Sequence, residues 1–317
     1  MRYIVIVFFL FSSLFAQKLI QPLHTYKISQ GLATDVLYTK NRLYISSDSG
    51  TVDIFNTKSK KKIQSIQLDK IKDFMGDEIA SKIFTLDLLD QSLLILSQDN
   101  GGYSRVHLYQ NKKLMSIITN QDKLNIIKAK FIDKNTILLA LISNDIISYN
   151  IKTHTKNWTI QASMSKFSNF SLNNDRTKVA IADESGDVHV IYTKDGKKFK
   201  TLTGENVDNI FGVAFRNNIV LTGGQDRRAA VYNLKNSSSY HKLSKFFVYG
   251  VGLSPDGKIG AYSCDLDNNI EVFNTLNREN LGKFQGTKKV VNSIYFINEN
   301  EFFLNSNSKD VLYYKLK

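Results

Sequence analysis

Two stretches, LTGENVDNIFGVAFRNNIVLTGGQDRRAAVYN (202–233) and GVGLSPDGKIGAYSCDLDNNIEVFN (250–274), repeat one pattern of short runs and turns. In each, a run of alternating hydrophobic and polar residues precedes a turn that is rich in Asn or contains Pro-Asp-Gly, and further runs follow. Alternation with a period of two, bounded by such turns, is typical of half-buried antiparallel strands. The landmarks Tyr232 and Phe273 lie about 41 residues apart, a period that predicts the blades of a β-propeller.

The same period extends along most of the chain. Aromatic residues that end the third run of each unit recur about 40 residues apart, except across an inserted segment between the first two units. They are Phe55, Tyr109, Tyr149, Tyr192, Tyr232, Phe273 and Tyr314. The pattern predicts an all-β, seven-bladed β-propeller that forms one domain over residues 17–317. The last unit stops after its third run, so we expect the unpartnered run from Leu23 to Ile28 to pair with it and close the ring, which removes an exposed sheet edge.

One segment, Asp69 to Ala80, interrupts the regular spacing. Its residues Ile71, Phe74, Met75 and Ile79 recur at helical spacing, so this is the one place where a helix longer than a turn or two is expected. The segment is long for a connection between blades, and long loops more often carry function. We therefore take Phe74 and Met75 as candidate partner contacts, together with Arg227 and Arg228 in a turn of the fifth unit.

The two clearest units resemble the WD-repeat family. Ser254 to Lys258 is similar to the family's turn between its first two strands, and Gly223 to Asp226 to the turn before its third strand. Glu205 stands where the family has the His of its Gly-His pair, and Tyr232-Asn233 stands in place of Trp-Asp. These replacements remove the His and Trp of the family's Asp-His-Ser-Trp hydrogen-bond network, but they leave the strand pattern unchanged. The resemblance implies the propeller fold, which hosts many unrelated functions.

The N-terminal residues Met1 to Ala16 form a separate signal. Arg2 supplies a positive start, Ile4 to Phe11 an apolar run, and small residues lead to Ala16. This order is typical of a secretory signal peptide, with cleavage expected after Ala16 and a periplasmic location for the mature chain. The apolar run is short for a spanning helix, which needs roughly 20 residues, so a retained anchor is the alternative.

No catalytic, cofactor or metal site is predicted. The five histidines fall in different units without metal-ligand spacing, and no Gly-x-Ser-x-Gly or Cys-x-x-Cys-His motif is present. Cys264, the only cysteine, falls in a predicted second strand, where we expect a buried and unreactive thiol. An enzyme or small-molecule binder that uses the central channel stays open as an alternative, and a bound ligand or a buried cluster of His and carboxylates there would decide for it.

The formal net charge is +13 at pH 7, and basic residues gather at the turns between third and fourth strands. They are Lys58, Lys60, Lys61, Lys62, Lys112, Lys113, Lys152, Lys156, Lys194, Lys197 and Lys198. In a propeller these turns share one face, so the lysines could steer an anionic partner or bind an anionic membrane surface. The alternative is that they only keep the turns soluble. Lys60, Lys61, Lys197 and Lys198 are candidate contacts, and the export signal argues against nucleic acid as the partner.

A rigid disc without catalytic motifs predicts a monomeric, non-enzymatic scaffold for protein–protein interaction. Over the whole chain, the signal peptide, the composition and the degenerate WD units also resemble the accessory proteins encoded with periplasmic nitrate reductases. That resemblance implies a role in maturation or electron supply of the reductase, with its components as protein partners and without a cofactor. An outer-membrane assembly scaffold or another cell-envelope scaffold is the alternative.

Overall fold

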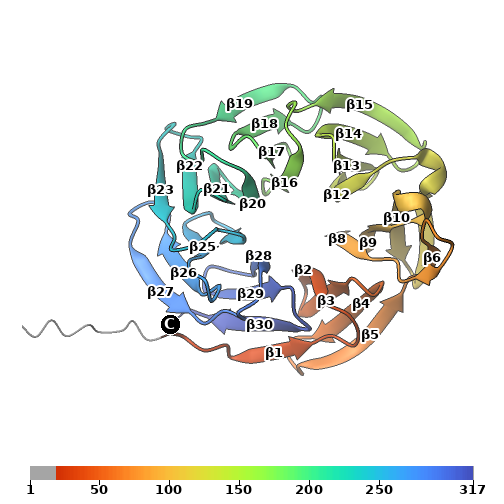
Figure 1. Ribbon diagram of the computed structural model, residues 1–317, viewed down its shortest axis with the longest axis horizontal. Coiled ribbons are helices and arrows are strands. Elements are labelled where there is room, and N and C mark those ends of the chain that lie inside the picture. The colour runs from red at the N-terminus through yellow and green to blue at the C-terminus, as the bar shows by residue number, and fades with distance from the viewer. Residues whose placement is uncertain (1–18, 317) are drawn as a thin grey trace, which may run out of the picture.

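The computed structural model describes residues 19–316, and they form seven four-stranded antiparallel sheets arranged in a ring (Figure 1). The predicted seven-bladed β-propeller is confirmed. Blades 1 to 6 each use consecutive strands, ordered from the channel outward. Blade 1 consists of β2 (Ala33–Thr39), β3 (Arg42–Ser47), β4 (Thr51–Asn56) and β5 (Lys61–Gln67). Blade 2 consists of β8 (Ile83–Leu89), β9 (Ser92–Gln98), β10 (Ser104–Gln110) and β11 (Lys113–Ile118). Blade 3 consists of β12 (Ile126–Asp133), β13 (Thr136–Leu141), β14 (Asp145–Asn150) and β15 (Thr155–Gln161).

Blades 4 to 6 repeat the arrangement. Blade 4 consists of β16 (Phe167–Leu172), β17 (Lys178–Asp183), β18 (Val188–Tyr192) and β19 (Lys198–Leu202). Blade 5 consists of β20 (Ile210–Arg216), β21 (Ile219–Gly224), β22 (Arg228–Asn233) and β23 (Ser239–Leu243). Blade 6 consists of β24 (Val251–Leu253), β25 (Ile259–Ser263), β26 (Ile270–Asn274) and β27 (Asn280–Phe284). Two short 3-10 turns, η1 (Asn100–Gly102) and η2 (Asn120–Asp122), lie in the connections around blade 2.

Blade 7 joins the two ends of the chain. Its inner strands β28 (Val291–Phe296), β29 (Glu301–Ser306) and β30 (Asp310–Lys315) come from the C-terminus, and its outermost strand is β1 (His24–Lys27). Strand β1 pairs antiparallel with β30, with Tyr26 opposite Val311. The Tyr26 ring is buried edge-on against Phe55 of blade 1 and Phe303 of blade 7, with centroids 5.4 and 5.9 Å away. The predicted closure by the N-terminal strand is confirmed.

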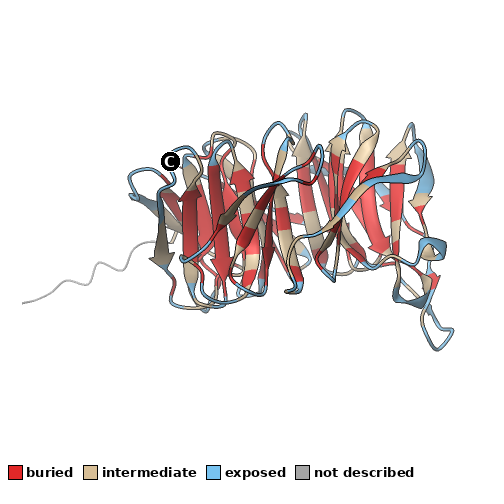
Figure 2. Ribbon diagram, turned by 90° about the horizontal axis from the view of Figure 1, so that it is seen from above, coloured by how far each residue is buried: buried red, intermediate tan, exposed pale blue. Residues whose placement is uncertain are grey.

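The burial of each strand follows its position in the blade. The second strands lie between neighbouring blades and are apolar on both faces; in β13, the residues from Ile137 to Ala140 are all fully buried. The fourth strands form the rim, and β15 is mostly exposed. Figure 2 shows this gradient, with buried residues in the inner strands and exposed ones at the rim and turns. Apolar side chains therefore fill the spaces between blades, and this packing sets the angle at which the blades meet.

The inserted segment is a β-hairpin, and the expected helix is wrong. Strands β6 (Ile71–Lys72) and β7 (Glu78–Ile79) pair, and Asp73 caps the turn between them by accepting hydrogen bonds from the backbone N–H of Met75 and Asp77. Gly76 adopts a φ of 88°, which favours a turn over a helix. Ile71 is buried while Phe74 and Met75 point into solvent, so the helical spacing did not mark a shared apolar face.

Antiparallel alternation gives the disc two different faces. The loop face carries the connections from each fourth strand to the next first strand and the turns between second and third strands. The basic face carries the turns between first and second strands and between third and fourth strands. The β6–β7 hairpin belongs to a connection of the loop face and projects from the disc (Figure 2).

In blade 5 an asparagine links the second strand to the turn before the third strand. Thr222 Oγ1 donates to Asn206 Oδ1 at 2.5 Å, and Asn206 Nδ2 donates to Asp226 Oδ1 at 3.1 Å. The Asp226 carboxylate also accepts from the backbone N–H of Val207 and Arg228. Asn206 lies one residue after Glu205, the position aligned with the family's His, so the link from turn to strand is retained with another residue.

The predicted signal peptide, residues 1–16, lies outside the described residues. Within residues 19–316, no helix is long and apolar enough to cross a bilayer. Cys264 is buried just after β25, and burial raises the pKa of its thiol to about 12. The prediction of a buried cysteine is confirmed, and a pKa this high leaves almost no thiolate at neutral pH.

Candidate functional site

The loop face exposes large apolar side chains. Phe74, Met75 and Met164 are 83%, 86% and 91% exposed, more than any other large hydrophobic residue of the described chain. Further exposed apolar residues of this face are Val207, Leu243 and Leu266. They come from the connections after blades 1, 3, 4 and 5 and from a turn of blade 6. These side chains are spread around the ring on one face of the disc, where each could contact a protein partner that covers this face.

An aromatic cluster lies at the centre of the same face, where the channel opens. Phe211 stacks on Tyr249 with ring centroids 5.1 Å apart, Phe246 stacks on Phe247 at 4.7 Å, and Phe211 and Phe247 lie 6.3 Å apart. All four rings are half-buried. Phe211 and Tyr249 line, together with Phe84, a cavity of about 380 Å³. The loop face thus combines an aromatic hollow with protruding apolar side chains around it.

The predicted contacts Phe74, Met75, Arg227 and Arg228 all lie on the loop face, but the structure does not bring them together. The first two belong to the hairpin between blades 1 and 2, whereas the arginines belong to the β21–β22 turn of blade 5, across the ring (Figure 1). Arg227 is exposed. Arg228 is half-buried and its Nη1 donates to the carbonyl of Glu205 at 2.7 Å, so it holds the neighbouring connection in place.

The predicted lysine contacts lie on the opposite face. Lys60, Lys61, Lys197 and Lys198 are all exposed at turns between third and fourth strands of blades 1 and 4. The six such turns contain Lys58, Lys60, Lys112, Lys152, Lys194, Lys197, Lys235 and Arg278 against Asp195 and Glu279. The prediction that these turns share one face is confirmed, and the exposed side chains of Phe74, Met75 and Met164 lie on the other face.

A third candidate site is the central channel, a cavity of about 600 Å³ between the inner strands. Its charged side chains are Asp35 of β2, Asp87 of β8, Lys128 and Lys130 of β12, Arg176 of the β16–β17 turn and Arg216 of β20. No histidine lines this cavity. The channel lining therefore lacks the cluster of His and carboxylate side chains that would have indicated an enzyme.

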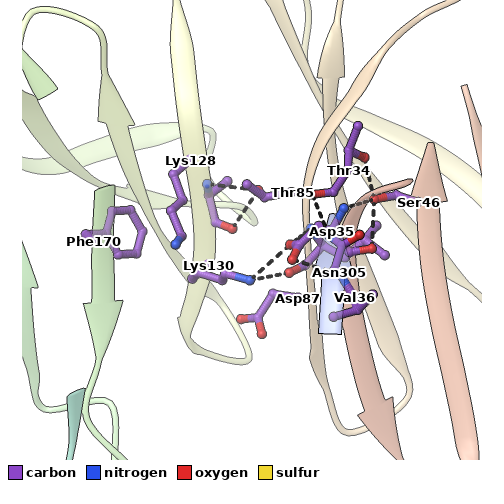
Figure 3. A network of polar contacts seen from close by, with 12 residues as sticks. Thr34, Asp35, Val36, Ser46, Thr85, Asp87, Lys128, Lys130, Phe170 and Asn305 are labelled. Atoms are coloured by element: carbon purple, nitrogen blue, oxygen red, sulfur yellow. Dashed lines mark hydrogen bonds and ion pairs between the residues drawn. The ribbon is translucent and has the colours of Figure 1, made fainter. Parts of the chain in front are cut away.

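Two ion pairs neutralise part of this charge. Lys130 Nζ lies 3.6 Å from Asp35 Oδ2 and also donates to the carbonyl of Leu86 (Figure 3). Arg176 Nη1 lies 2.6 Å from Asp87 Oδ2. The Asp35 carboxylate in addition accepts from the backbone N–H of Leu86, so it joins blades 1 and 2.

Lys128 and Arg216 have no such carboxylate partner among the described residues. Lys128 Nζ donates to Asn169 Oδ1 at 2.6 Å. It also lies 5.3 Å from the centre of the Phe170 ring (Figure 3). Arg216 Nη1 donates to the carbonyls of Leu172 and Phe215 at 3.2 and 2.8 Å. Solvent reaches part of the Lys128 side chain through the channel, but protein atoms surround its ammonium group. This burial, and the positive charge of Lys130, lower the pKa of Lys128 to about 7.

A further cluster of polar side chains lies around Glu205. Glu205 accepts hydrogen bonds from Ser239 Oγ at 2.6 Å and lies 2.7 Å from His241 Nδ1. The serine therefore contacts the carboxylate and not the imidazole, so the histidine does not activate it as a nucleophile. No group of three or more His, Cys, Asp or Glu side chains suited to a metal ion occurs in residues 19–316.

Sequence reasoning missed the channel charges although a signal for them was present. Asp87, Lys128 and Lys130 interrupt otherwise apolar runs in the predicted first strands KIFTLDLL and IIKAKFI. A charged side chain in the innermost strand of a propeller has only the channel as a polar environment.

The strand order and ring define the class of protein as a seven-bladed β-propeller, compatible with a WD-repeat-like arrangement. Comparison of the chain with models of known protein families and with curated proteins finds no match.

Proposed function

We propose that the protein is a non-enzymatic, monomeric scaffold of the periplasm that docks a protein partner on its loop face. The observation that supports this most is the exposure of Phe74, Met75 and Met164 on the face that also holds the aromatic hollow around Phe211. Desolvating such side chains favours association, and exposed aromatic and Met residues are typical anchors of protein interfaces.

The basic face would orient the disc relative to an anionic surface or partner. Its lysines project away from the loop face, so an anionic membrane surface or an acidic partner could be engaged there while the apolar face stays free. Surface electrostatics of this kind is screened over about 8 Å at physiological ionic strength. Binding to anionic vesicles should therefore be present at low salt and absent at high salt, and loss of binding in a Lys197→Gln, Lys198→Gln variant would locate it on this face.

For the partner, we propose components of a periplasmic nitrate reductase, which makes the protein an accessory factor of the NapL type for maturation or electron supply. The support for this part is the resemblance in export signal, composition and degenerate repeats. A scaffold for outer-membrane assembly is the alternative with another partner, and the same loop face would serve it.

The test is a binding assay between the purified mature protein and purified components of the reductase. A Phe74→Ser, Met75→Ser variant should bind at least about tenfold more weakly, since removing buried interface anchors costs more than about 1 kcal/mol each. The matched control is Ile63→Ser, Leu276→Ser, which removes two exposed apolar side chains near the basic face. Equal loss in both variants would contradict docking on the loop face. Binding to outer-membrane assembly components in place of the reductase would favour the alternative partner.

The location is tested separately. Intact-mass measurement of the protein from a periplasmic fraction should give a chain that begins at Gln17. A chain that keeps residues 1–16 and sediments with membranes would show an anchored form.

A further inference from the structure

We propose that the central channel is a binding site for a small anion of oxyanion or carboxylate chemistry, with Lys128 as the group that binds it. This site is separate from the loop face, and the proposal does not depend on the scaffold function.

The first observation is the charge balance inside the channel. The lining holds four cationic side chains and two carboxylates, Asp35 and Asp87. Both carboxylates are already paired, with Lys130 and Arg176. Placing unpaired charge in a poorly solvated site costs free energy, and an anion of opposite charge offsets that cost. Lys128 and Arg216 are thus left without a carboxylate partner, and a bound anion would offset their positive charge.

The second observation is how Lys128 is held. Its chain extends from β12 toward blade 4, where Asn169 accepts a hydrogen bond at 2.6 Å and the Phe170 ring lies beneath the ammonium group at 5.3 Å. An ammonium group has three N–H donors, and the hydrogen bond to Asn169 uses one of them. No other hydrogen bond from this ammonium group occurs among the described residues, and Lys128 lines the cavity, so a ligand there would accept from its remaining N–H groups. Asn169 is itself positioned, because its Nδ2 donates to the carbonyl of Phe211 at 3.2 Å.

The third observation is the size and polarity of the cavity. A volume of about 600 Å³ accommodates a small anion with several waters. Hydroxyl and amide side chains line it beside the charged residues, among them Thr85, Ser168, Ser171 and Asn292. Each of them donates to a protein oxygen in this structure, and Asn292 Nδ2 keeps a second N–H for an anion oxygen beside the ammonium group of Lys128. The same set would serve an inorganic oxyanion or a small dicarboxylate.

Binding should be coupled to protonation of Lys128. The charged groups that face it are Lys130 on its own strand, Asp35 and Asp87 on β2 and β8, Arg176 on the β16–β17 turn and Arg216 on β20. Burial and the cations lower the pKa of Lys128 to about 7, although the two carboxylates act in the opposite direction. A bound anion favours the charged ammonium and raises this pKa. Affinity should therefore fall as pH rises from 6 to 8.

Isothermal titration calorimetry with sodium sulfate and with sodium succinate, at low ionic strength, tests the site and separates the two ligand classes. We expect saturable binding of at least one of them. Lys128→Gln should weaken it about tenfold, the effect of losing one charge-assisted hydrogen bond. Lys197→Gln, which removes the same charge on the basic face, should leave the affinity within about twofold of the wild type. Equal weakening by both variants, no effect of Lys128→Gln, or no binding of either anion would overturn the proposal.

Proton linkage tests the same site in the unaltered protein, so the result does not depend on folding of a variant. Neither sulfate nor succinate gains or loses protons near pH 7.5, whereas Lys128 with a pKa of about 7 is only about one quarter protonated there. Titrations in two buffers of different ionisation enthalpy should show uptake of about half a proton or more per anion bound. Binding without proton uptake would place the anion away from Lys128.

Discussion

The guanidinium of Arg176 lies against the carboxylate of Asp87, with Nη1 2.6 Å from Oδ2 and Nη2 3.2 Å from Oδ1. Arg176 belongs to the first turn of blade 4 and Asp87 to the inner strand of blade 2. The same Nη1 also donates to the carbonyl of Phe131 in blade 3 at 2.6 Å. One side chain therefore links three consecutive blades along the wall of the channel.

This pair should contribute to stability. Arg176→Met would leave the buried Asp87 carboxylate with only its hydrogen bond from the backbone N–H of Phe131. Breaking a buried pair costs roughly 3–5 kcal/mol, and because Arg176 is partly exposed we expect about 2–3 kcal/mol in urea unfolding. The double variant with Asp87→Asn should lose less than the sum of the single variants. Additive losses would show that the two side chains do not interact.

Ring closure by the N-terminal strand gives a second prediction. Tyr26→Ala should cost about 3–5 kcal/mol, because it removes a buried ring from the contact between blades 7 and 1. Thr25→Ala, on the exposed side of the same strand, is the control and should change stability by less than about 0.5 kcal/mol. Deletion of residues 23–28 should leave an open and aggregation-prone ring. A deleted protein that melts like the wild type would contradict the role of this strand.

The asparagine that replaces part of the WD-family network gives a third prediction. Asn206→Ala would leave the fully buried Thr222 hydroxyl with only a long hydrogen bond of 3.4 Å to the carbonyl of Ala230, and the Asp226 carboxylate with fewer donors. We expect a loss of about 1–3 kcal/mol in the free energy of unfolding. The exposed Asn236, in a turn of the same blade, is the matched position, and its change to Ala should have a smaller effect. Equal losses at both positions would mean that the network adds nothing.

His107 gives a prediction on pH. Burial, and to a smaller extent Arg105, lower the pKa of this buried imidazole to about 4, below the ordinary value of 6.5. The unfolded chain therefore binds the proton more readily. The neutral histidine contributes its full share of stability above pH 6.5, and that share is lost as pH falls from 6.5 toward 4, by up to about 3 kcal/mol.

Unfolding by urea at several pH values between 4 and 7 measures this loss. His107→Gln should flatten the decline in this range, whereas His154→Gln, at an exposed turn, should leave it unchanged. The buried Asp53 and Asp99 have pKa values lowered below 3.8, with hydrogen bonds outweighing desolvation, so their contributions are lost only at lower pH. If stability declines in the same way in His107→Gln, groups other than His107 cause the decline.

The fold could be predicted because each blade repeats a local signal. Alternating runs, Asn and Gly turns and the aromatic landmarks depend on neighbouring residues only, and even the closing strand followed from counting the runs of the last unit. The inserted hairpin could not be predicted in this way. The spacing of Ile71, Phe74, Met75 and Ile79 fits a helix, but the Asp73 turn and Gly76 decide the local conformation.

The candidate sites were predicted only in part. The sequence shows that Phe74 lies in a long connection between a fourth strand and the next first strand, where an exposed side chain is expected. It also shows that the lysine turns all join third to fourth strands, and such turns share one face of a propeller. The channel cluster joins residues from separate blades, for example Asp87 and Arg176, and Asn206 replaces a residue of another position in the family pattern. Such pairs depend on how blades meet in space, which no local pattern encodes.

The most direct test of the central claim is site-specific photocrosslinking from the two faces in the periplasm. Benzoylphenylalanine at Met164, 91% exposed on the loop face, should crosslink to one defined protein, and we expect mass spectrometry to identify a nitrate reductase component. The same group at Leu276, 58% exposed on the basic face, should not form that adduct. The adduct from Leu276 without one from Met164, or no protein adduct from Met164, would contradict docking on the loop face.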